Sequence, residues 1–343
     1  MSSIIIKKVV VKNFRKHEEC VLDVKNKKTI IVGANGVGKT SLLEAIYIVL
    51  TGKSFKGVDR DILRAESEFY KVDAKFASGR MVSAIFQDGR KSFLVDGRKS
   101  GRLPKQEKYP VVLFEPDDLN LVGGSPTRRR TYFDRNICLV DEEYHNSLLK
   151  YTKALRQRNE ALKNGGITED RVFSWNVLLA KYGTEVARGR KKYVEKVNER
   201  IGERYWDIAG KADEVFVEYF SGCGVLEAEY LRELEKGFVR DAAIGHTNFG
   251  VHKDDFVFRF NNSRAETTVS RGELRSVILS LKFVEAGIFE GRFGEKPIIL
   301  LDDVFSELDE ARRRRLTEEF EDNQIIMTSV EAVEIGAGVV VLE

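Results

Sequence analysis

The feature that most constrains the fold is a glycine-rich segment between an apolar strand and a helix. It is Gly33-Ala34-Asn35-Gly36-Val37-Gly38-Lys39-Thr40. Lys28 to Val32 before it has the pattern of a buried strand, and apolar residues recur at helical spacing from Thr40 to Leu50. Glycines let backbone N–H groups curl around phosphate oxygens, and a helix N-terminus favours negative charge. The segment therefore predicts a phosphate-binding loop in an α/β fold.

This loop supplies most of the residues expected to contact a nucleotide. Lys39 can neutralise the β and γ oxygens of a triphosphate, and the Thr40 hydroxyl can ligate Mg²⁺. The expected nucleotide-binding residues here are Gly33, Ala34, Asn35, Gly36, Val37, Gly38, Lys39, Thr40 and Ser41, with Arg15 from near the start of the chain. ATP and Mg²⁺ are the predicted cofactors.

A second apolar strand, Ile298 to Leu301, ends in Asp302 and Asp303. Asp302 is expected to hold the magnesium ion through a water, as the acidic partner of a phosphate loop. Asp303 is one residue further on, where it can orient or deprotonate an attacking water. A strand that ends in solvated acids is common by itself, but beside a phosphate loop it favours a nucleotide hydrolase. The predicted catalytic residues are Asp303 and Lys39.

A third motif, Ser270-Arg271-Gly272-Glu273, opens a helix predicted over 271–289. Alone it is an N-cap. Between a phosphate loop and an acidic strand it resembles the signature motif of the ATP-binding-cassette (ABC) superfamily. That resemblance implies that Ser270 and Gly272 reach the nucleotide of a second subunit in a homodimer. Ser306 to Asp309 then corresponds to the D-loop at the same boundary.

Further segments make the resemblance more specific. They are Asn13 to Arg15, Thr51 to Lys56, Phe114 to Leu119, Val122 to Pro126, Arg128 to Arg130 and Leu301 to Asp309. With these segments, from residue 11 to about 329, the chain resembles the RecF family of bacterial recombination mediators. The resemblance implies an ATP-gated clamp that dimerises on double-stranded DNA beside single-stranded gaps, with weak, DNA-stimulated ATP hydrolysis. It also implies RecR as a partner, and RecO and RecA indirectly, in recombinational repair.

The chain departs from the family pattern at three positions. Val251 and Lys253 stand where proline and arginine are usual, and Glu273 stands where many relatives have glutamine. These changes put partner contacts in question more than ATP binding. His252, between Val251 and Lys253, is either a hydrogen-bond hub of the fold or a catalytic group, and His17 is expected at the surface.

The predicted fold class is α/β: an ABC-type phosphate-loop ATPase head with an inserted, mainly helical lobe. The head (lobe I) is expected over 1–127 and 241–343, with a mixed sheet and an antiparallel meander between Tyr70 and Phe114. Lobe II is expected over 128–240, without a long coiled coil. Asp-Gly pairs at 88–89 and 96–97 predict tight hairpins.

The composition excludes zinc proteins, disulfide scaffolds and transmembrane channels. The net charge of +3 is too small to indicate a polyanion partner by itself, so local clusters must carry that argument. No apolar run approaches a membrane span, and three isolated cysteines suggest a reducing, cytoplasmic setting.

The basic clusters are Lys53, Lys56, Arg60 and Arg64; Arg128 to Arg130; Arg188, Arg190, Lys191 and Lys192; and Arg312 to Arg315. Each is either a solvated face or a contact to DNA phosphates.

Two other functions share the ATPase motifs: the nucleotide-binding subunit of a transporter, and the ATPase head of a defence system. The transporter subunit usually has a histidine after the last core strand, where this chain has Thr328 and Ser329. A chromosome-organising protein would need hundreds more residues between the phosphate loop and Ser270, so that alternative fails.

Overall fold

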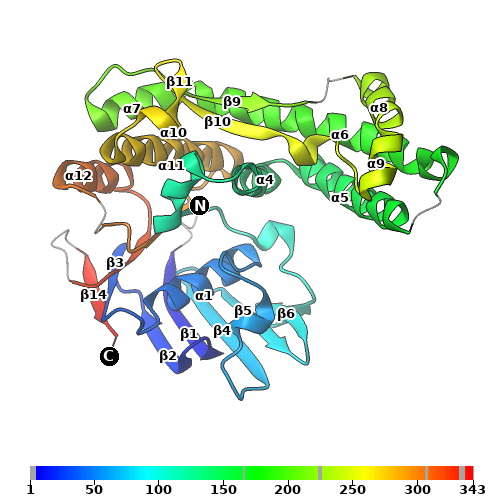
Figure 1. Cartoon of the computed structure of the whole chain (residues 1–343). Coiled ribbons are helices and arrows are strands. Elements are labelled where there is room, and N and C mark those ends of the chain that lie inside the picture. The colour runs from blue at the N-terminus through cyan, green and yellow to red at the C-terminus, as the bar shows by residue number, and fades with distance from the viewer. Residues whose placement is uncertain (1–4, 165–166, 223–225, 306–307, 332–336, 343) are drawn as a thin grey trace. The chain divides into compact units, whose positions relative to one another are not determined.

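The computed structural model describes residues 5–164, 167–222, 226–305, 308–331 and 337–342. The packing of the chain divides it into two compact units, residues 1–118 with 285–343, and residues 119–284 (Figure 1). The borders differ from those of the predicted lobes, because the strand over 255–260 pairs and packs within the second unit. The division into lobe I and lobe II therefore remains a prediction.

The first unit contains two sheets within the described residues. The first is antiparallel, with strand order β2-β1-β4-β5-β6-β7. Its strands are β1 (Ile6–Phe14), β2 (His17–Asp23), β4 (Phe69–Phe76), β5 (Met81–Gln87), β6 (Arg90–Val95) and β7 (Arg98–Ser100). Asp88, Gly89, Asp96 and Gly97 all have positive φ, from 47° to 82°. The meander with tight hairpins is therefore confirmed.

The second sheet of this unit is parallel, with strand order β14-β3-β13-β12-β8. Its strands are β3 (Lys28–Val32), β8 (Val111–Phe114), β12 (Ile298–Asp302), β13 (Ile325–Ser329) and β14 (Gly338–Val341). Parallel strands end at the same edge of a sheet. The register pairs Asp302 with Thr328 and Ser329 with Val32, so the loops after β3, β12 and β13 begin side by side.

Helix α1 (Lys39–Thr51) packs against strands of both sheets and is buried on nearly every side. Its apolar residues share one core with β1, β4 and β5 of the antiparallel sheet and with β8 and β12 of the parallel sheet. The phosphate loop thus begins a helix that is fixed by the core of the unit. The remaining helical segments here are α2 (Asp59–Ile62), η1 (Lys105–Glu107), η2 (Pro116–Leu119) and α12 (Glu310–Glu319).

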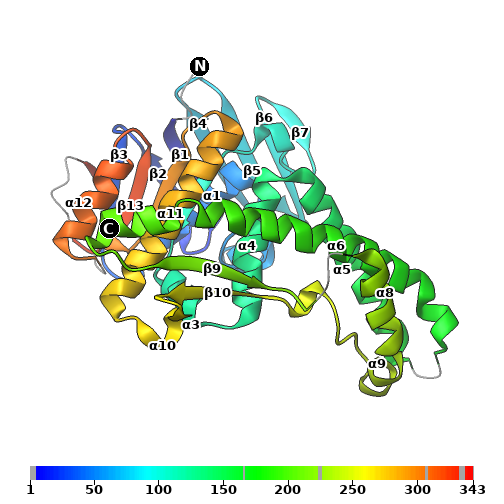
Figure 2. The same ribbon diagram turned by 90° about the horizontal axis from the view of Figure 1, so that it is seen from above.

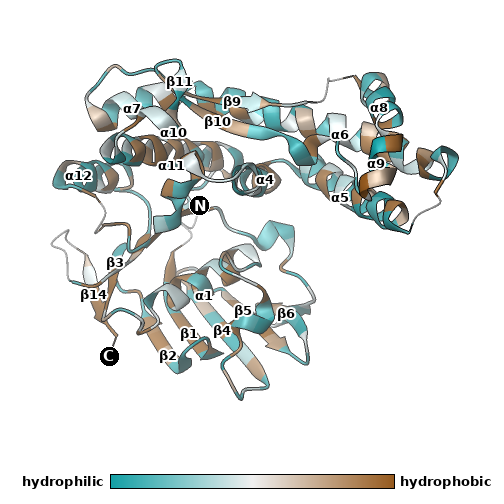
Figure 3. Cartoon of the chain, in the orientation of Figure 1, coloured by the Kyte–Doolittle hydropathy of each residue, from teal (hydrophilic) through white to brown (hydrophobic). Residues whose placement is uncertain are grey.

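The second unit is mainly helical, as predicted. Its helices are α3 (Asn120–Gly123), α4 (Pro126–Val140), α5 (Glu142–Lys163), α6 (Glu169–Asn198), α7 (Ile201–Ala209), α8 (Glu227–Lys236), α9 (Phe238–Ile244), η3 (Val251–Lys253) and α10 (Ala265–Thr268). Helix α11 (Arg271–Phe293) begins in this unit, and Figure 3 shows hydrophobic residues along it. Among the described residues, no helix is long and apolar enough to cross a bilayer.

A small antiparallel sheet with strand order β11-β10-β9 completes this unit. Its strands are β9 (Val215–Phe220), β10 (Asp255–Phe260) and β11 (Ser263–Arg264). Helix α6 lies along β9 (Figure 2). Two glycines of α6 allow aromatic rings to approach closely, since a Cβ at Gly189 would lie 2.4 Å from the Tyr144 ring and one at Gly183 2.6 Å from the Tyr230 ring.

Candidate nucleotide site

The predicted phosphate loop joins β3 to α1 and closes around a lysine. Lys39 Nζ donates to the carbonyl oxygens of Gly33 at 2.7 Å and Ala34 at 2.9 Å, and its side chain is almost fully buried. Gly36 and Gly38 have φ of 83° and 109°, in the region that favours glycine. The loop therefore places an ammonium group and a helix N-terminus together, which is the arrangement that binds an anion.

The hydroxyl of Thr40 and the acidic end of β12 meet at this loop. Thr40 Oγ1 donates to Asp302 Oδ1 at 2.7 Å, and Thr328 Oγ1 donates to the same oxygen at 3.1 Å. A hydroxyl beside a carboxylate offers the oxygen ligands that Mg²⁺ prefers, so these residues fit that ion. In the described part of the chain, no group of three or more acidic, histidine or cysteine side chains could hold a metal.

Asp303 follows β12 with a left-handed backbone, at φ 54°. Its N–H donates to Thr328 Oγ1 at 2.9 Å, so β13 fixes its position. Non-glycine residues adopt this conformation rarely, and such conformations concentrate at functional sites. The structure thus places Asp303 next to the metal-fitting carboxylate in a constrained backbone. Its role as a base remains a prediction.

The turn between β1 and β2 supports the phosphate loop, and no local sequence pattern indicates this contact. Lys16 Nζ donates to the Gly36 carbonyl at 2.9 Å, and His17 Nε2 lies 3.1 Å from the Gly38 carbonyl oxygen. A Cβ at Gly38 would lie 2.3 Å from His17 Nε2. The surface location expected for His17 is therefore wrong, since its ring is half-buried against the loop. Position 38 requires glycine for both φ and space.

Arg15 belongs to the same turn and is bound to a buried acid of α1. Its Nε and Nη2 donate to the two carboxylate oxygens of Glu44, each at 2.9 Å, and its Nη1 donates to the Asp61 carbonyl at 2.7 Å. The hydrogen bonds that Arg15 donates to Glu44 raise the pKa of Arg15. In this structure Arg15 is thus an organiser of the turn, and its contact with a nucleotide remains a prediction.

In the second unit, the signature-like motif forms a reciprocal cap at the start of α11. Ser270 N and Oγ donate to Glu273 Oε2 at 2.9 and 2.8 Å, and Glu273 N donates to Ser270 Oγ at 3.3 Å. This is a capping box, and it explains a glutamate at position 273. Hydrogen bonds from Ser270 and Lys211 lower the pKa of Glu273. Ser270 is exposed and Gly272 is half-buried. Of the predicted D-loop, Ser306 and Glu307 lie outside the described residues.

Two of the basic clusters each contain an arginine that is buried in the second unit. Arg129 is 5% exposed and pairs with Asp255 at 2.7 Å; Arg190 is 2% exposed and pairs with Asp134 at 2.9 Å. Neither guanidinium can reach a DNA phosphate without unpacking the second unit. The run from Arg312 to Arg315 interacts with neighbours, through Asp309, the Phe305 carbonyl and Glu318.

His252 forms a hydrogen-bond hub. Its Nδ1 lies 2.7 Å from the Tyr151 hydroxyl and its Nε2 lies 3.0 Å from the Thr247 carbonyl oxygen. Burial lowers the pKa of His252 to about 4. Both ring nitrogens thus serve the packing of the second unit, which favours the structural alternative over the catalytic one.

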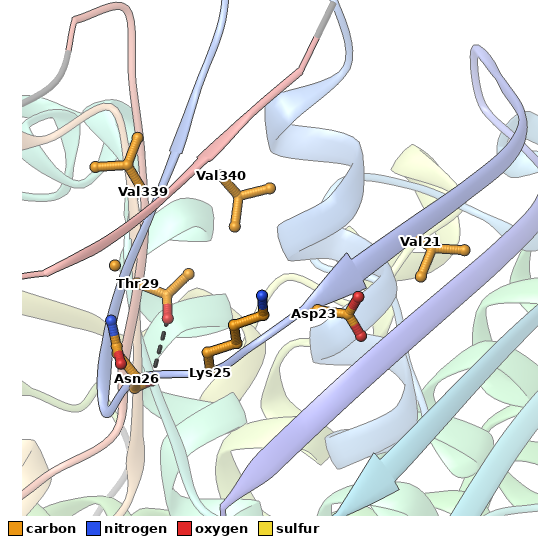
Figure 4. Close-up of a pocket in the computed structure, with 8 residues that line it drawn as sticks. Val21, Asp23, Lys25, Asn26, Thr29, Val339 and Val340 are labelled. Carbon is orange, nitrogen blue, oxygen red and sulfur yellow. Dashed lines mark hydrogen bonds between the residues drawn. The ribbon is translucent and has the colours of Figure 1, made fainter.

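A separate hollow of about 390 Å³ opens between β2, β3 and β14 (Figure 4). Its lining residues are Val21, Asp23, Lys25, Asn26, Thr29, Gly338, Val339 and Val340. None of these belongs to the predicted site, so this hollow is not the candidate nucleotide site.

The fold and the site define the class of protein. A family model for the AAA ATPase domain matches residues 5–120. A crystal structure of an SmcHead bound to the C-winged helix domain of ScpA has 17% identity and a TM-score of 0.54 over 98% of this chain and 93% of that one, and it shares the fold alone. With the phosphate loop and the acidic strand in place, the chain has the fold of an ABC-type ATPase head with a helical insertion.

More similar proteins define the family. A solved structure described as the recombination mediator protein RecF-ATP in the RecFOR pathway has 28% identity and a TM-score of 0.88, and it covers 97% of this chain and 94% of that one. The DNA replication and repair protein RecF of Lachnoclostridium phytofermentans is 31% identical over 94% of this chain and 92% of its own length. That of Clostridium tetani is 30% identical over 92% and 90%. The chain belongs to the RecF family.

Proposed function

We propose that the chain is an ATP-gated DNA-binding clamp that acts in DNA repair and replication. The observation that carries the proposal is the contact between Thr40 and Asp302 beside the buried Lys39, in a chain of the RecF family. RecF structures are described with ATP and with the RecFOR pathway, and the curated relatives are DNA replication and repair proteins. Family membership favours this function over a transporter subunit or a defence ATPase.

The residues of the loop account for binding and hydrolysis of ATP. Lys39 exchanges the carbonyls of Gly33 and Ala34 for phosphate oxygens, and the N–H groups at the start of α1 donate hydrogen bonds to the same anion. Thr40 directly and Asp302 through a water would hold Mg²⁺, which would neutralise phosphate charge. Asp303 orients the attacking water and accepts its proton.

A second copy of the chain completes the site in this proposal. Ser270 and Gly272 of that copy contact the γ-phosphate, since an exposed hydroxyl and N–H groups at the start of a long helix suit an anion. The Ser270 hydroxyl then exchanges its bond with Glu273 for a phosphate oxygen. ATP thereby joins a symmetric homodimer, and slow, DNA-stimulated hydrolysis releases it.

The proposed partner is double-stranded DNA at gaps and at junctions with single strands, where the clamp promotes RecA loading. RecR is a proposed protein partner, with RecO and RecA acting indirectly. Exposed Lys191, Lys192 and Arg188 remain available for phosphate contacts, whereas Arg129 and Arg190 do not. Contacts of this kind carry little sequence information and weaken with salt.

A DNA titration tests the proposal. Gapped, duplex and single-stranded DNA are titrated with the native chain, with and without ATP, at two salt concentrations. We expect gapped DNA with ATP to bind most tightly and to weaken at the higher salt concentration. Equal binding with and without ATP, or a preference for single strands, would contradict the proposal.

A further inference from the structure

A buried acid beside the phosphate loop has no role in the proposed chemistry. Glu44 lies one turn after Thr40 on α1, is 1% exposed, and stands among the apolar residues Leu43 and Ala45. A buried carboxylate is costly unless it is paired and hydrogen-bonded. Glu44 is both, because it accepts two bonds from Arg15 and one, at 2.5 Å, from the Ser54 hydroxyl.

The Ser54 hydroxyl links this acid to the turn that follows α1. Besides donating to Glu44, Ser54 Oγ accepts from the backbone N–H groups of Lys56 at 2.9 Å and Gly57 at 3.1 Å. A serine that bonds N–H groups two and three residues ahead stabilises a turn. The backbone of Lys56 is therefore fixed relative to α1 through Glu44.

This turn points a cation at the carboxylate that fits the metal. Lys56 Nζ lies 3.7 Å from Asp302 Oδ2, while the other oxygen of Asp302 accepts the Thr40 hydroxyl. A positive charge here attracts a triphosphate. It also opposes a second cation at the same carboxylate, because like charges a few Å apart repel.

We infer that Glu44 is a positioning residue of the nucleotide site, which through Ser54 holds Lys56 at the carboxylate of Asp302. The inference rests on the proposed ATP-binding function. It assigns to Lys56 an electrostatic role: the lysine favours metal-free triphosphate and disfavours the metal-bound form. The measurable quantity is the ratio of the ATP dissociation constant in EDTA to that in excess Mg²⁺.

The test changes the turn and leaves the Arg15–Glu44 pair intact, since a Glu44 variant risks unfolding. Ser54→Ala removes the link, Ser54→Thr keeps a hydroxyl, and Lys56→Gln removes the charge. We expect Ser54→Ala and Lys56→Gln each to raise the ratio about three- to tenfold, the range expected for one partly exposed charge. Ser54→Thr should give the native ratio, and the double variant Ser54→Ala/Lys56→Gln should match Lys56→Gln alone.

Three results would overturn the inference. They are a native ratio in Ser54→Ala, a change in Ser54→Thr as large as in Ser54→Ala, and a double variant whose change is the product of the two single changes. A purely structural role of Ser54 would lower the melting temperature without moving the ratio. Failure of the proposed function is distinguishable, since the native chain would then bind ATP no better than Lys39→Ala.

Discussion

At the scale of single residues, the site uses backbone conformations that most side chains avoid. Asp303 and Arg15 have φ of 54° and 56°, and Gly38 has 109°. At the two non-glycine residues, Asp303 and Arg15, such conformations cost about 1–3 kcal/mol each and persist only where their surroundings hold them. Thr328 Oγ1 accepts the backbone N–H of Asp303, and the Ile62 carbonyl oxygen accepts the backbone N–H of Arg15. These hydrogen bonds therefore hold the strained backbone of the site in place.

Asp303→Asn separates binding from hydrolysis. Asparagine tolerates the left-handed backbone as aspartate does, but it cannot accept a proton from water. We expect ATP affinity within about threefold of native and a turnover rate lowered about 100-fold or more. Nucleotide titration and single-turnover hydrolysis measure the two quantities. A loss of affinity as large as that of Lys39→Ala would show that the assigned role of Asp303 is wrong.

Gly38→Ala should disrupt the loop for two reasons that can be separated. Its φ of 109° is strained for alanine, and the new Cβ would lie 2.3 Å from His17 Nε2. We expect Gly38→Ala to abolish measurable ATP binding and to destabilise the fold by about 1–3 kcal/mol. Urea unfolding and nucleotide titration check this. Adding His17→Ala relieves the collision alone, so a full recovery of binding in the double variant would refute the backbone argument.

Sequence patterns identified the residues of the loop and the acidic strand because each has a local signature. Glu44 has a weaker one, an acid within the apolar run of α1, and it was missed. His17 was misplaced because its contact with Gly38 crosses from the β1–β2 turn to the loop before α1. Arg129 and Arg190 counted as basic surface because their acidic partners, Asp255 and Asp134, lie far away in the sequence.

At the scale of elements, buried ion pairs connect neighbouring helices of the second unit. Arg158 of α5 is fully buried and donates to Asp241 of α9 and to Thr247, each at 2.7 Å. Arg190 of α6 binds Asp134 of α4 at 2.9 Å and the Val251 carbonyl at 2.6 Å. Such pairs fix which helices meet, because removing one partner leaves an uncompensated buried charge.

The substitution Asp241→Asn measures how much the buried Arg158–Asp241 pair contributes to stability. It leaves the buried guanidinium of Arg158 without its counter-charge, so we expect a loss of about 3–5 kcal/mol in the free energy of unfolding. The matched control is Glu318→Gln on α12, an exposed partner of Arg314 and Arg315, which should change stability by about 1 kcal/mol or less. Urea denaturation measures both. Equal effects of the two substitutions would contradict the assigned importance of the buried pair.

His252 should make the stability of the second unit depend on pH. Its pKa falls to about 4 in the folded chain, below the ordinary value of 6.5, so the unfolded chain binds the proton more readily. Stability should therefore fall as the pH drops from 6.5 towards 4, with a contribution on the order of 2 kcal/mol between pH 7 and pH 5. Urea denaturation at these two pH values should show a smaller difference for His252→Gln. An unchanged difference would mean that other groups cause the pH dependence.

Periodicity predicted most of the elements and their order. The phosphate-loop helix and the antiparallel meander lie where helical spacing and alternation predicted them, and the predicted mainly helical region contains the long helices α5 and α6. The border between the units was not predictable in this way. It depends on the pairing of β9 with β10, and a pairing between strands so far apart in the sequence leaves no local pattern.

At the scale of the whole molecule, the proposed site is complete only in two copies of the chain. The nucleotide residues Lys39, Thr40 and Asp302 belong to the first unit, and Ser270 and Gly272 belong to the second. The proposal assigns these two sets to opposite subunits around one ATP. The oligomeric state must then follow the nucleotide, and salt should weaken DNA binding more than dimerisation.

Light scattering of the native chain and of Lys39→Ala, each with and without ATP and Mg²⁺, tests this claim most directly. We expect ATP to double the mass of the native chain and Lys39→Ala to stay monomeric throughout. A native chain that binds ATP and remains a monomer, or a Lys39→Ala chain that dimerises with ATP as the native chain does, would contradict this claim.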